Sequence, residues 1–476
     1  MTTPPATMSL DALVRLQKTA RAAEGAVSAD VRRDRLQRVI DLVVKHRDRL
    51  CAAIGGDFGN RPRSFSLMYD LTGSIAALKH ARKNVAGWMK PERRRGYFPF
   101  NVLGARAFVE HCPKGVVGIM GTWNFPVYTL LAPLAYVFAA GNRAVLKPSE
   151  LTPRTADLVA DAVSEFFRPE ELAVVNGGPE VGQAFSGQPF DHLVLTGGTH
   201  VGRAVMRNAA ENLVPLTLEL GGKAPVVVGR SADLEIAAER IVLAKTTNSG
   251  QLCVNADVLY VPQENLEAML AAMRRHFDRF YPGSYAENPD WVSIISERHC
   301  QRVDDYVNEA QGLGARVETL GGTYHGPHGT RLPLRLVISP ARECRIMQNE
   351  IFGPALIVLP YETIGEVIAD INSRERPLAL YYFGHDAREE RQLLDHTISG
   401  GVTINDVAMH PGLHDAPFGG IGASGMGHYG GREGFLEFSH ARTIFRAGWW
   451  DPRRALGLLP PISRKMESLA ERGVSR

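Results

Sequence analysis

Two residues stand in surroundings that suit covalent catalysis. Cys253 directly follows a glycine-bearing turn, where a thiol is accessible and its thiolate can act as a nucleophile. Glu219 lies thirty-four residues earlier, inside an apolar run, where partial burial would raise its pKa towards that of a general base. Each has an ordinary alternative. A lone cysteine is commonly an inert small hydrophobe, and Glu219 could instead form a structural pair with Lys223.

A third polar residue, Asn124, lies in the turn Trp123–Pro126, between a predicted strand and a predicted helix. An asparagine amide at such a turn can donate a hydrogen bond to an oxyanion, and a proline suits the first helical turn. The alternative is that Asn124 caps the helix that begins near Pro126. Taken with Cys253 and Glu219, it forms a more specific signal than any of the three residues alone.

Two further turns have features of a nucleotide site. The turn Lys147–Glu150 follows the second strand, a position that faces the adenosine ribose in doubly wound folds. Glu150 can accept from ribose hydroxyls, and Lys147 can donate to them or offset a 2′-phosphate. The alternative is a turn in which Ser149 caps the chain.

The glycine-rich segment Thr196–Gly202 follows the fourth strand and opens a helix, so its backbone can approach a phosphate at a helix N-terminus. A plain glycine-rich turn is the alternative. A literal GxGxxG match at Gly420–Gly425 continues into more glycine rather than into a helix, and we reject it as a nucleotide loop.

The elements around these turns indicate an α/β protein. Helical periodicity dominates the first ninety or so residues, with an apolar stripe at Leu36, Val39, Ile40 and Val43, and residues 97–111 are hairpin-like. Alternating strands and helices then predict a parallel sheet covered by helices on both faces, with ligands bound beyond the carboxyl ends of the strands. The expected strands are Val116–Gly121, Arg143–Lys147, Leu172–Asn176 and His192–Leu195, and the helices are Val127–Ala140, Thr155–Phe167 and Val201–Leu213.

A second set of elements begins at Leu216 and predicts a second α/β domain. Its expected strands are Ala224–Val228, Val258–Val261 and Ala355–Leu359, and its helices are Ile236–Thr246, Leu266–Phe280 and Ile364–Ile371.

Composition limits the class of protein. The 476 residues carry a net charge of +3, and the short basic run at residues 93–95 is more typical of a solvated face than of a nucleic-acid site. Five scattered cysteines without CxxC spacing argue against a disulfide framework or structural zinc, and for a reducing compartment. The stretch Thr129–Ala140 is too short to span a bilayer, and residues 1–10 do not form a secretory signal. We therefore expect a cytoplasmic protein with no metal ion.

Along almost its whole length the chain resembles the aldehyde dehydrogenase superfamily. The motifs that carry the resemblance are WNFP at Trp123, KPSE at Lys147, TGGTHVG at Thr196, LELGGK at Leu218, GQLC at Gly250, EIFGP at Glu350 and PFGGIGASGMG at Pro417. A short N-terminal region and the pattern at residues 404–410 and 438–440 resemble the class 3 branch. Residues 56–59 and 81–91 look closest to bacterial coniferyl aldehyde dehydrogenases.

The resemblance implies a role for each residue. Cys253 would attack the aldehyde, Asn124 and the Cys253 backbone N–H would hold the oxyanion, and Glu219 would activate the hydrolytic water. The cofactor would be NAD, with NADP accepted, Glu350 at the nicotinamide ribose and Phe352 near the ring. The whole implied cofactor set is Trp123, Lys147, Ser149, Glu150, Gly197, Gly198, Thr199, His200, Val201, Gly202, Glu350 and Phe352.

The resemblance also implies a division of the chain and a homodimer. Residues 1–95 and 114–219 would form a Rossmann-type cofactor-binding domain, and residues 220–415 the catalytic domain. Residues 96–113 and 416–450 would form a small oligomerisation region, followed by a C-terminal tail at 451–476. The tail lacks the hydrophobic anchor of membrane-bound fatty-aldehyde members.

The expected activity is the NAD(P)-dependent oxidation of an aldehyde to a carboxylic acid. The aldehyde would be aromatic, such as coniferyl aldehyde, or a medium- to long-chain aliphatic one. One alternative is a CoA-acylating dehydrogenase of the same fold, although those enzymes generally lack the glutamate base. Another is a non-catalytic, crystallin-like descendant, which would be free to lose Cys253 or Glu219.

Overall fold

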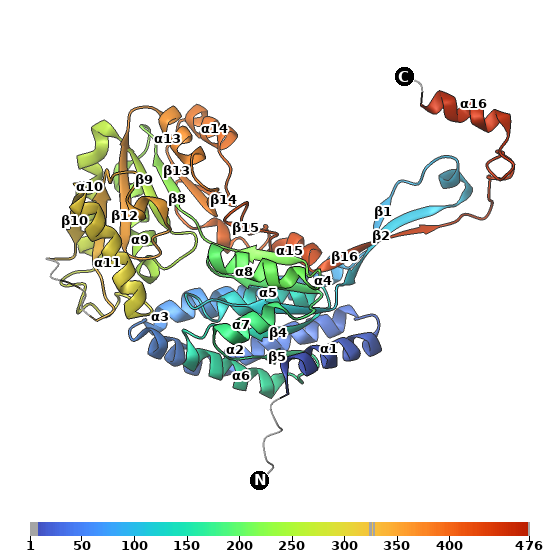
Figure 1. Cartoon of the computed structure of the whole chain (residues 1–476), viewed down its shortest axis with the longest axis horizontal. Coiled ribbons are helices and arrows are strands. Elements are labelled where there is room, and N and C mark those ends of the chain that lie inside the picture. Colours follow the sequence, from blue (N-terminus) through green and yellow to red (C-terminus); the bar gives the residue numbers. More distant parts are fainter. Residues whose placement is uncertain (1–7, 323–325, 327–328, 475–476) are drawn as a thin grey trace, which may run out of the picture.

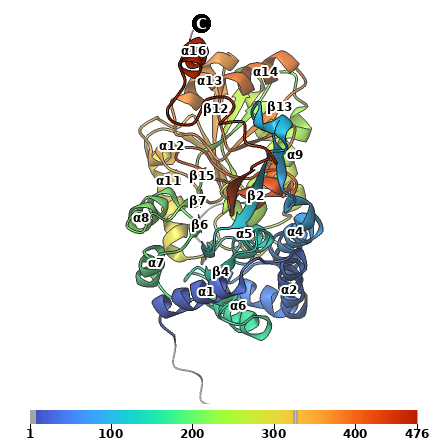
Figure 2. The ribbon, with the colours of Figure 1, turned by 90° about the vertical axis from the view of Figure 1, so that its right-hand side faces the viewer.

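The computed structural model describes residues 8–322, 326 and 329–474. These residues form two α/β bodies and a narrow arm that projects from them (Figure 1). Figure 2, viewed from the side of the arm, places α1, α2 and α6 at one end and α13 and α14 at the other. The predicted α/β class, with two α/β units and a small hairpin-containing sheet, is confirmed.

The first body is built on a six-stranded sheet in the order β15-β7-β6-β3-β4-β5. Its strands pair in parallel except β15, which is antiparallel to β7. The strands are short and largely buried, as expected for a sheet covered on both faces. They are β3 (Val116–Met120), β4 (Arg143–Lys147), β5 (Leu172–Val174), β6 (His192–Thr196), β7 (Leu216–Glu219) and β15 (Gly425–Met426).

Helices cover both faces of this sheet. One face packs against α2, α4, α5 and α6, and the other against α1, α7 and α8. The predicted stripe of α2 at residues 36, 39, 40 and 43 is buried in the first of these layers. The helices are α1 (Leu10–Glu24), α2 (Ala29–Phe58), α3 (Arg63–Phe65), the π-helical segment η1 (Ser66–Thr72), α4 (Gly73–Trp88), α5 (Tyr128–Ala139), α6 (Pro153–Phe166), α7 (Pro179–Ser186), α8 (Thr199–Ala210) and α15 (Gly431–Glu437).

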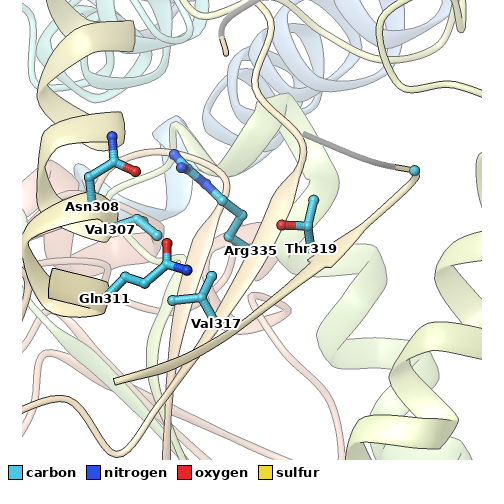
Figure 3. A pocket seen from close by; sticks show the side chains of 7 residues that line it. Val307, Asn308, Gln311, Val317, Thr319 and Arg335 are labelled. Atoms are coloured by element: carbon cyan, nitrogen blue, oxygen red, sulfur yellow. The ribbon is translucent and has the colours of Figure 1, made fainter. Parts of the chain in front are cut away.

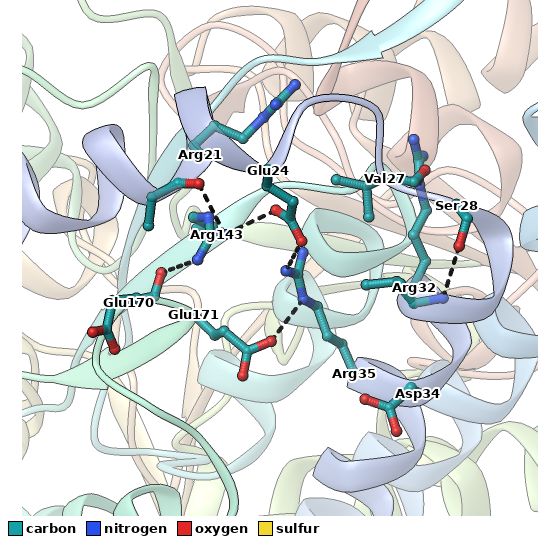
Figure 4. Close-up of polar contacts among 12 residues, drawn as sticks. Arg21, Glu24, Val27, Ser28, Arg32, Asp34, Arg35, Arg143, Glu170 and Glu171 are labelled. Carbon is teal, nitrogen blue, oxygen red and sulfur yellow. Dashed lines mark hydrogen bonds and ion pairs between the residues drawn. The ribbon is translucent and has the colours of Figure 1, made fainter.

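Ion pairs hold helices α1 and α2 against the amino ends of strands β4 and β5 (Figure 4). Arg35 of α2 donates to Glu24 at 2.5 Å and to Glu171 at 3.2 Å, and Arg143 of β4 donates to the other oxygen of Glu24 at 2.9 Å. Arg38, one turn along α2, donates to both oxygens of Glu171 at 3.0 Å. Every oxygen of the two carboxylates therefore accepts a charged hydrogen bond.

The second body has a seven-stranded sheet in the order β10-β11-β12-β9-β8-β13-β14, parallel except for the β10–β11 pair. Helices α9 and α10 pack on one face, and α11 to α14 on the other. The strands are β8 (Ala224–Val228), β9 (Ala256–Pro262), β10 (Arg316–Leu320), β11 (Leu334–Ile338), β12 (Ala355–Tyr361), β13 (Ala379–Phe383) and β14 (Gly401–Ile404). The helices are α9 (Leu234–Thr246), α10 (Leu266–Phe280), α11 (Glu297–Gly312), α12 (Arg345–Gln348), α13 (Ile364–Asn372) and α14 (Ala387–His396).

The arm is a three-stranded antiparallel sheet of β1 (Glu92–Arg94), β2 (Arg106–Pro113) and β16 (Ser439–Arg446). It joins β1 and β2, from the hairpin-like region, to β16 near the end of the chain, and helix α16 (Arg464–Gly473) lies beyond it (Figure 1). Strand pairing departs from the predicted division at two places. β1 begins before residue 96, and β15 of the expected oligomerisation region completes the first sheet. The division itself stays a prediction.

Candidate active site

A cavity of about 2000 Å³ runs between the two α/β bodies. Cys253, Glu219 and Asn124 line it together, although they come from three distant segments. Of the twelve residues expected to bind cofactor, eleven line the same cavity, which places both halves of the predicted chemistry in one space. They are Trp123, Lys147, Ser149, Glu150, Gly197, Gly198, Thr199, His200, Val201, Glu350 and Phe352.

Strand register brings the motifs of the first body together. Met120, the last residue of β3, pairs with Lys147 of β4 and Leu195 of β6, and Thr196 pairs with Glu219 of β7. The motifs WNFP, KPSE, TGGTHVG and LELGGK therefore lie at the carboxyl ends of four neighbouring parallel strands, β3, β4, β6 and β7. This edge of a doubly wound sheet is where such folds bind ligands.

Asn124 is buried and bonded to the loop that carries the cysteine. Its Nδ2 donates to the Gln251 carbonyl at 3.0 Å, and its Oδ1 is buried with no partner in the described structure. The amide nitrogen carries a second hydrogen, which can serve a substrate oxygen. The alternative that Asn124 caps the following helix is wrong, because the first N–H groups near α5 are bonded by Asp70 instead.

The cysteine loop is held in a strained shape. Asn248 and Ser249 have φ of 51° and 50°, a left-handed conformation that costs energy in residues with a Cβ. Gly250 also has a positive φ of 78°, and a Cβ there would lie 2.2 Å from the Gly353 carbonyl oxygen. Glycine is therefore required where this loop meets the loop after Glu350.

Cys253 is partly exposed in the cavity, and its protein surroundings disfavour ionisation of its thiol. Burial raises the pKa of Cys253 to about 12, and the negative charges of Glu350 and Glu219 add to the rise. The backbone N–H groups of Cys253 and Val254 oppose it by facing the sulfur. A base close to the thiol is consequently needed for nucleophilic attack at neutral pH.

Glu219 is a buried carboxylate without a partner. Its side chain is 2% exposed, and neither oxygen accepts a hydrogen bond within the described structure. Burial raises its pKa well above the ordinary 4.5, and the charge of Glu437 adds to this effect. The alternative of a structural pair with Lys223 is wrong. The Lys223 Nζ donates instead to Asp257 at 3.1 Å and to two backbone carbonyls.

Lys223 and Asp257 hold the loop that carries Glu350. Lys223 donates to the Asn349 carbonyl at 2.8 Å, and Asp257 accepts from the Ile351 N–H at 2.9 Å. Burial raises the pKa of Glu350 to about 8, and the negative charge of Asp257 adds to the rise. The Oε1 atom of Glu350 is buried and has no hydrogen-bond partner in the described structure. A Cβ at Gly221 would lie 2.3 Å from the Glu350 carboxylate, so a larger residue there would displace that side chain.

Aromatic rings meet beside this carboxylate. The ring of Trp123 lies 5.3 Å from Phe352 in an edge-on arrangement and 5.3 Å from His299. Phe352 has a φ of 46°, another strained position at the cavity wall.

Lys147 and Glu150 also line the cavity. The Lys147 Nζ donates to the carbonyls of Pro148 and Gly177 at 3.0 Å each and lies 3.5 Å from Glu150. Ser149 accepts from the Leu151 N–H at 3.2 Å, so it stabilises the turn while it lines the cavity. The side chain of Glu150 is 43% exposed and free to meet a ligand.

Helix α8 presents its N-terminus to the cavity through Gly197, Gly198 and Thr199. Gly202 is the one expected cofactor residue that does not line the cavity. A Cβ there would lie 3.0 Å from Leu220, so Gly202 permits close packing of helix and sheet. The glycine-rich segment at 420–425 also lies outside the lining, and a Cβ at Gly425 would strike the Leu218 carbonyl at 2.2 Å.

A second hollow, of about 480 Å³, lies between α11 and the strands β10 and β11 (Figure 3). It contains none of the predicted site residues. Its lining includes Asn308, Gln311, Thr319 and Arg335, and Arg335 is bound to Asp304 at 2.6 Å.

The sequence motif around Cys253 does not reveal the hydrogen bonds that support the loop. The buried side chain of Gln251 donates to the carbonyls of Asn248 and Ser293, and its Oε1 accepts from the Ile295 N–H. Arg61 and Asp70, which touch the Asn124 turn, were missed entirely. Nothing in the sequence around them marks a partner more than fifty residues away.

Over residues 8–322, 326 and 329–474, no cluster of three or more His, Cys, Asp or Glu side chains suits a metal ion. Within the same ranges, every helix is too short or too polar to cross a bilayer.

Comparisons with known proteins agree with this geometry. The model of the aldehyde dehydrogenase family matches residues 6–444. A probable coniferyl aldehyde dehydrogenase of Caulobacter vibrioides is 46% identical over 449 residues, which cover 94% of this chain and 92% of the relative. An aldehyde dehydrogenase family 3 member A2 of Rattus norvegicus is 39% identical, over 72% of this chain and 69% of its own.

Solved structures agree in fold over nearly the whole chain. AldH of Staphylococcus aureus, in a substrate-bound state, superposes with a TM-score of 0.91 at 29% identity and covers 98% of this chain and 99% of its own. An aldehyde dehydrogenase of Mycobacterium tuberculosis in complex with NAD⁺ has a TM-score of 0.82 at 28% identity, over 93% of this chain and 90% of its own. The predicted resemblance is confirmed. The chain belongs to the aldehyde dehydrogenase family, in its class 3 branch beside the coniferyl aldehyde dehydrogenases, and is an oxidoreductase.

Proposed function

We propose that the protein oxidises an aldehyde to a carboxylic acid, with NAD as the hydride acceptor and Cys253 as the covalent nucleophile. The observation that carries this proposal is the convergence of Cys253, Asn124 and Glu219 on one cavity between the two bodies. A thiol, an amide donor and an unpartnered carboxylate are the groups that thioester chemistry requires.

The first half of the reaction forms the thioester. The Cys253 thiol loses its proton and its sulfur bonds to the aldehyde carbon, so the carbonyl oxygen becomes an oxyanion. The Asn124 amide and the Cys253 backbone N–H donate to that oxygen. Because burial raises the pKa of the thiol, its proton has to pass to a base in the cavity as the sulfur attacks. NAD held by Glu350 and the N-terminus of α8 would supply the hydride acceptor, and loss of the hydride from the same carbon would restore the C–O double bond as a thioester.

The second half releases the acid. Glu219 takes a proton from water, and the water oxygen bonds to the thioester carbon. The carbon–sulfur bond then breaks, the acid leaves and the thiol of Cys253 is restored. The raised pKa of Glu219 suits this task, since a stronger base at working pH is a better proton acceptor.

Several residues that line the cavity have the chemistry to hold NAD. Glu350 has a buried oxygen without a partner in the described structure, which suits a ribose hydroxyl on the nicotinamide side. The N-terminus of α8 faces the cavity and favours the pyrophosphate. Lys147 and Glu150 would take the adenosine ribose. Because the lysine attracts a 2′-phosphate and the glutamate repels it, we propose NAD as the preferred cofactor with NADP accepted.

We propose an aromatic aldehyde of the coniferyl type as the substrate. The Caulobacter relative is named as a probable coniferyl aldehyde dehydrogenase, and the cavity has several aromatic side chains that can pack against a substrate ring. They are Tyr69, Phe125, Tyr128, Phe418 and Tyr429.

The test is an assay of NADH formation with coniferyl, benzyl and medium- to long-chain aliphatic aldehydes, with NAD or NADP, each with and without CoA. We expect turnover without CoA, fastest with the aromatic aldehydes, and its complete loss in Cys253→Ala with cofactor binding retained. A tenth or more of wild-type turnover in Cys253→Ala would overturn the covalent mechanism. Strict dependence on CoA would replace hydrolysis by acyl transfer, and inactivity with every aldehyde would favour a non-catalytic protein.

We also propose that the enzyme is a cytoplasmic homodimer that binds no nucleic acid. The arm and the segment after it expose several large apolar side chains, among them Phe98 at 78% and Trp449 at 80%, which suit burial against a second copy. All five cysteines are free thiols, in keeping with a reducing compartment. Light scattering of the purified chain tests the dimer, and the mass of a single chain would contradict it.

A further inference from the structure

The short loop between α2 and α3 joins the two halves of the site. The Asn60 amide donates to the Trp291 carbonyl at 2.7 Å, and the Asn60 carbonyl accepts from the Ser293 N–H at 2.9 Å. The Ser293 carbonyl in turn accepts from Gln251 of the cysteine loop at 3.1 Å. This loop of the first body is thereby fixed to the segment that supports Cys253 in the second.

Arg61, the next residue, reaches the oxyanion side. Its side chain is fully buried, its Nη1 donates to the Asn124 carbonyl at 2.7 Å, and its Nη2 donates to Asp70. The guanidinium lies 4.7–5.1 Å from the centres of three aromatic rings, which fix its plane. The rings belong to Phe58, Phe65 and Phe125.

Asp70 completes the frame from the other side of the turn. Its Oδ2 accepts from Arg61, and its Oδ1 accepts from the N–H groups of Val127 and Tyr128 at 3.2 and 3.3 Å. Asp70 lies in the π-helical segment η1, a wider turn of the kind often found at functional sites. The buried ion pair therefore contacts the Asn124 turn at two points. Arg61 binds the Asn124 carbonyl, and Asp70 binds the first N–H groups of the helix that follows.

We propose that Arg61, held by Asp70, is a positioning residue that sets the Asn124 amide against the Cys253 loop for oxyanion stabilisation. This inference rests on the role of Asn124 in the proposed function. The planar guanidinium can bind two acceptors at a fixed angle, and a lysine ammonium cannot reproduce that geometry. Oxyanion donors act only when they are aimed in advance at the charge that develops, so a small displacement of Asn124 lowers the rate.

The physical cost of the pair supports a geometric role. Burial lowers the pKa of Arg61 and raises that of Asp70, and the attraction between them offsets this penalty. Buried ion pairs of this kind are often replaceable by apolar residues without loss of stability. An apolar residue in place of Arg61 cannot donate the hydrogen bond to the Asn124 carbonyl.

The test is a double-mutant cycle between Arg61→Met and Asn124→Ala, with kcat/KM for an aldehyde and Kd for NAD as readouts. We expect Arg61→Met to lower kcat/KM by about tenfold to hundredfold, with the NAD Kd within about twofold of wild type. In the Asn124→Ala background it should cost almost nothing more, because the two residues act through one interaction. The matched control is Arg35→Met, which removes another buried arginine with two ion pairs far from the cavity (Figure 4) and should leave kcat/KM unchanged.

Several outcomes would overturn the inference. Wild-type kcat/KM in Arg61→Met would do so, as would multiplied losses in the double variant. Multiplied losses together with an inactive Cys253→Ala would leave the proposed function standing and remove this inference alone. Wild-type kcat/KM in Asn124→Ala would remove the oxyanion role itself and the inference with it. Where Arg61→Met does not fold, Arg61→Lys and Asp70→Asn replace it, with the same expected loss and the same non-additivity with Asn124→Ala.

Discussion

Carboxylates at the two ends of the strands of the first sheet differ in their hydrogen bonding. At the amino ends of β4 and β5, Glu24 and Glu171 accept charged hydrogen bonds at all four oxygens. Those from Arg35 and Arg143 are visible in Figure 4, and Arg38 donates to both oxygens of Glu171. At the carboxyl edge of the strands, Glu219 is more deeply buried and accepts none in the described structure.

The pKa values follow this difference. Burial alone would raise the pKa of Glu171, but the hydrogen bonds and charges of Arg38 and Arg35 outweigh it, and the pKa falls below the ordinary value. Burial without a partner raises the pKa of Glu219. The first arrangement fastens helices to the sheet. The second leaves a buried carboxyl group uncompensated, an arrangement that is common at functional sites.

The largest expected effect comes from removing the unpartnered charge. Glu219→Gln should lower steady-state turnover by about 10²–10⁴-fold, because a neutral amide cannot take a proton from water. The thioester should still form, so rapid-mixing measurements should record a burst of one NADH per active site. A lost burst would mean that Glu219 also activates Cys253. Unchanged burst and turnover would assign the base to another group.

The pH dependence of deacylation should report the raised pKa of Glu219. The rate of thioester hydrolysis should rise about tenfold per pH unit below that pKa and level off above it, since only the carboxylate is the base. The free energy of unfolding should instead fall as pH rises. The contribution of Glu219 to folding is present below its unfolded pKa of 4.5 and is lost as pH rises through the folded value.

The same linkage gives Glu219→Gln a stability signature. The variant does not lose this contribution, so its free energy of unfolding relative to wild type should grow as pH rises above about 4.5. Denaturant unfolding at several pH values measures the difference. A difference independent of pH would mean that Glu219 titrates normally in the folded state.

The paired carboxylates should behave in the opposite way. Glu171→Gln should lower the free energy of unfolding by about 1–3 kcal/mol at neutral pH, because two buried or half-buried arginines lose their acceptor, while turnover stays within about twofold. A depressed folded pKa means that this stability is present above the unfolded value of 4.5 and lost as pH falls through the folded value. Impaired turnover in a folded Glu171→Gln enzyme would contradict the separation of the two regions.

The smallest effect is expected at Glu150, which is partly exposed and weakly paired with Lys147 at 3.5 Å. Glu150→Gln removes a negative charge near the expected 2′ position, so the ratio of kcat/KM for NADP to that for NAD should rise by a few-fold. Steady-state kinetics with both cofactors measure this ratio. An unchanged ratio would remove Glu150 from cofactor selection.

Local patterns predicted much of the architecture. The apolar stripe of α2 and the strands β3, β4 and β6 follow from residue periodicity, which is a property of neighbouring residues. The strands β10, β11, β13 and β14 were not predicted, since short apolar runs in the later part of the chain do not separate strand from buried helix. The pairing of β15 with β7 lies beyond any local pattern, because it joins residues about two hundred positions apart.

The sequence by itself singled out the residues that we propose to carry the chemistry. Cys253, Glu219 and Asn124 stand in motifs whose types and order are readable without coordinates, and all three line the cavity. Their partners were decided by the tertiary structure. Lys223 pairs with Asp257 rather than with Glu219.

Asn124 was the alternative cap for the start of α5, but Asp70 accepts from the N–H groups there instead, and Arg61 reaches Asn124 across sixty-three positions. Burial and hydrogen-bond partners belong to packed segments and not to neighbours in the chain. The state of each charge, and hence its function, therefore exists only once the two bodies are assembled around the cavity.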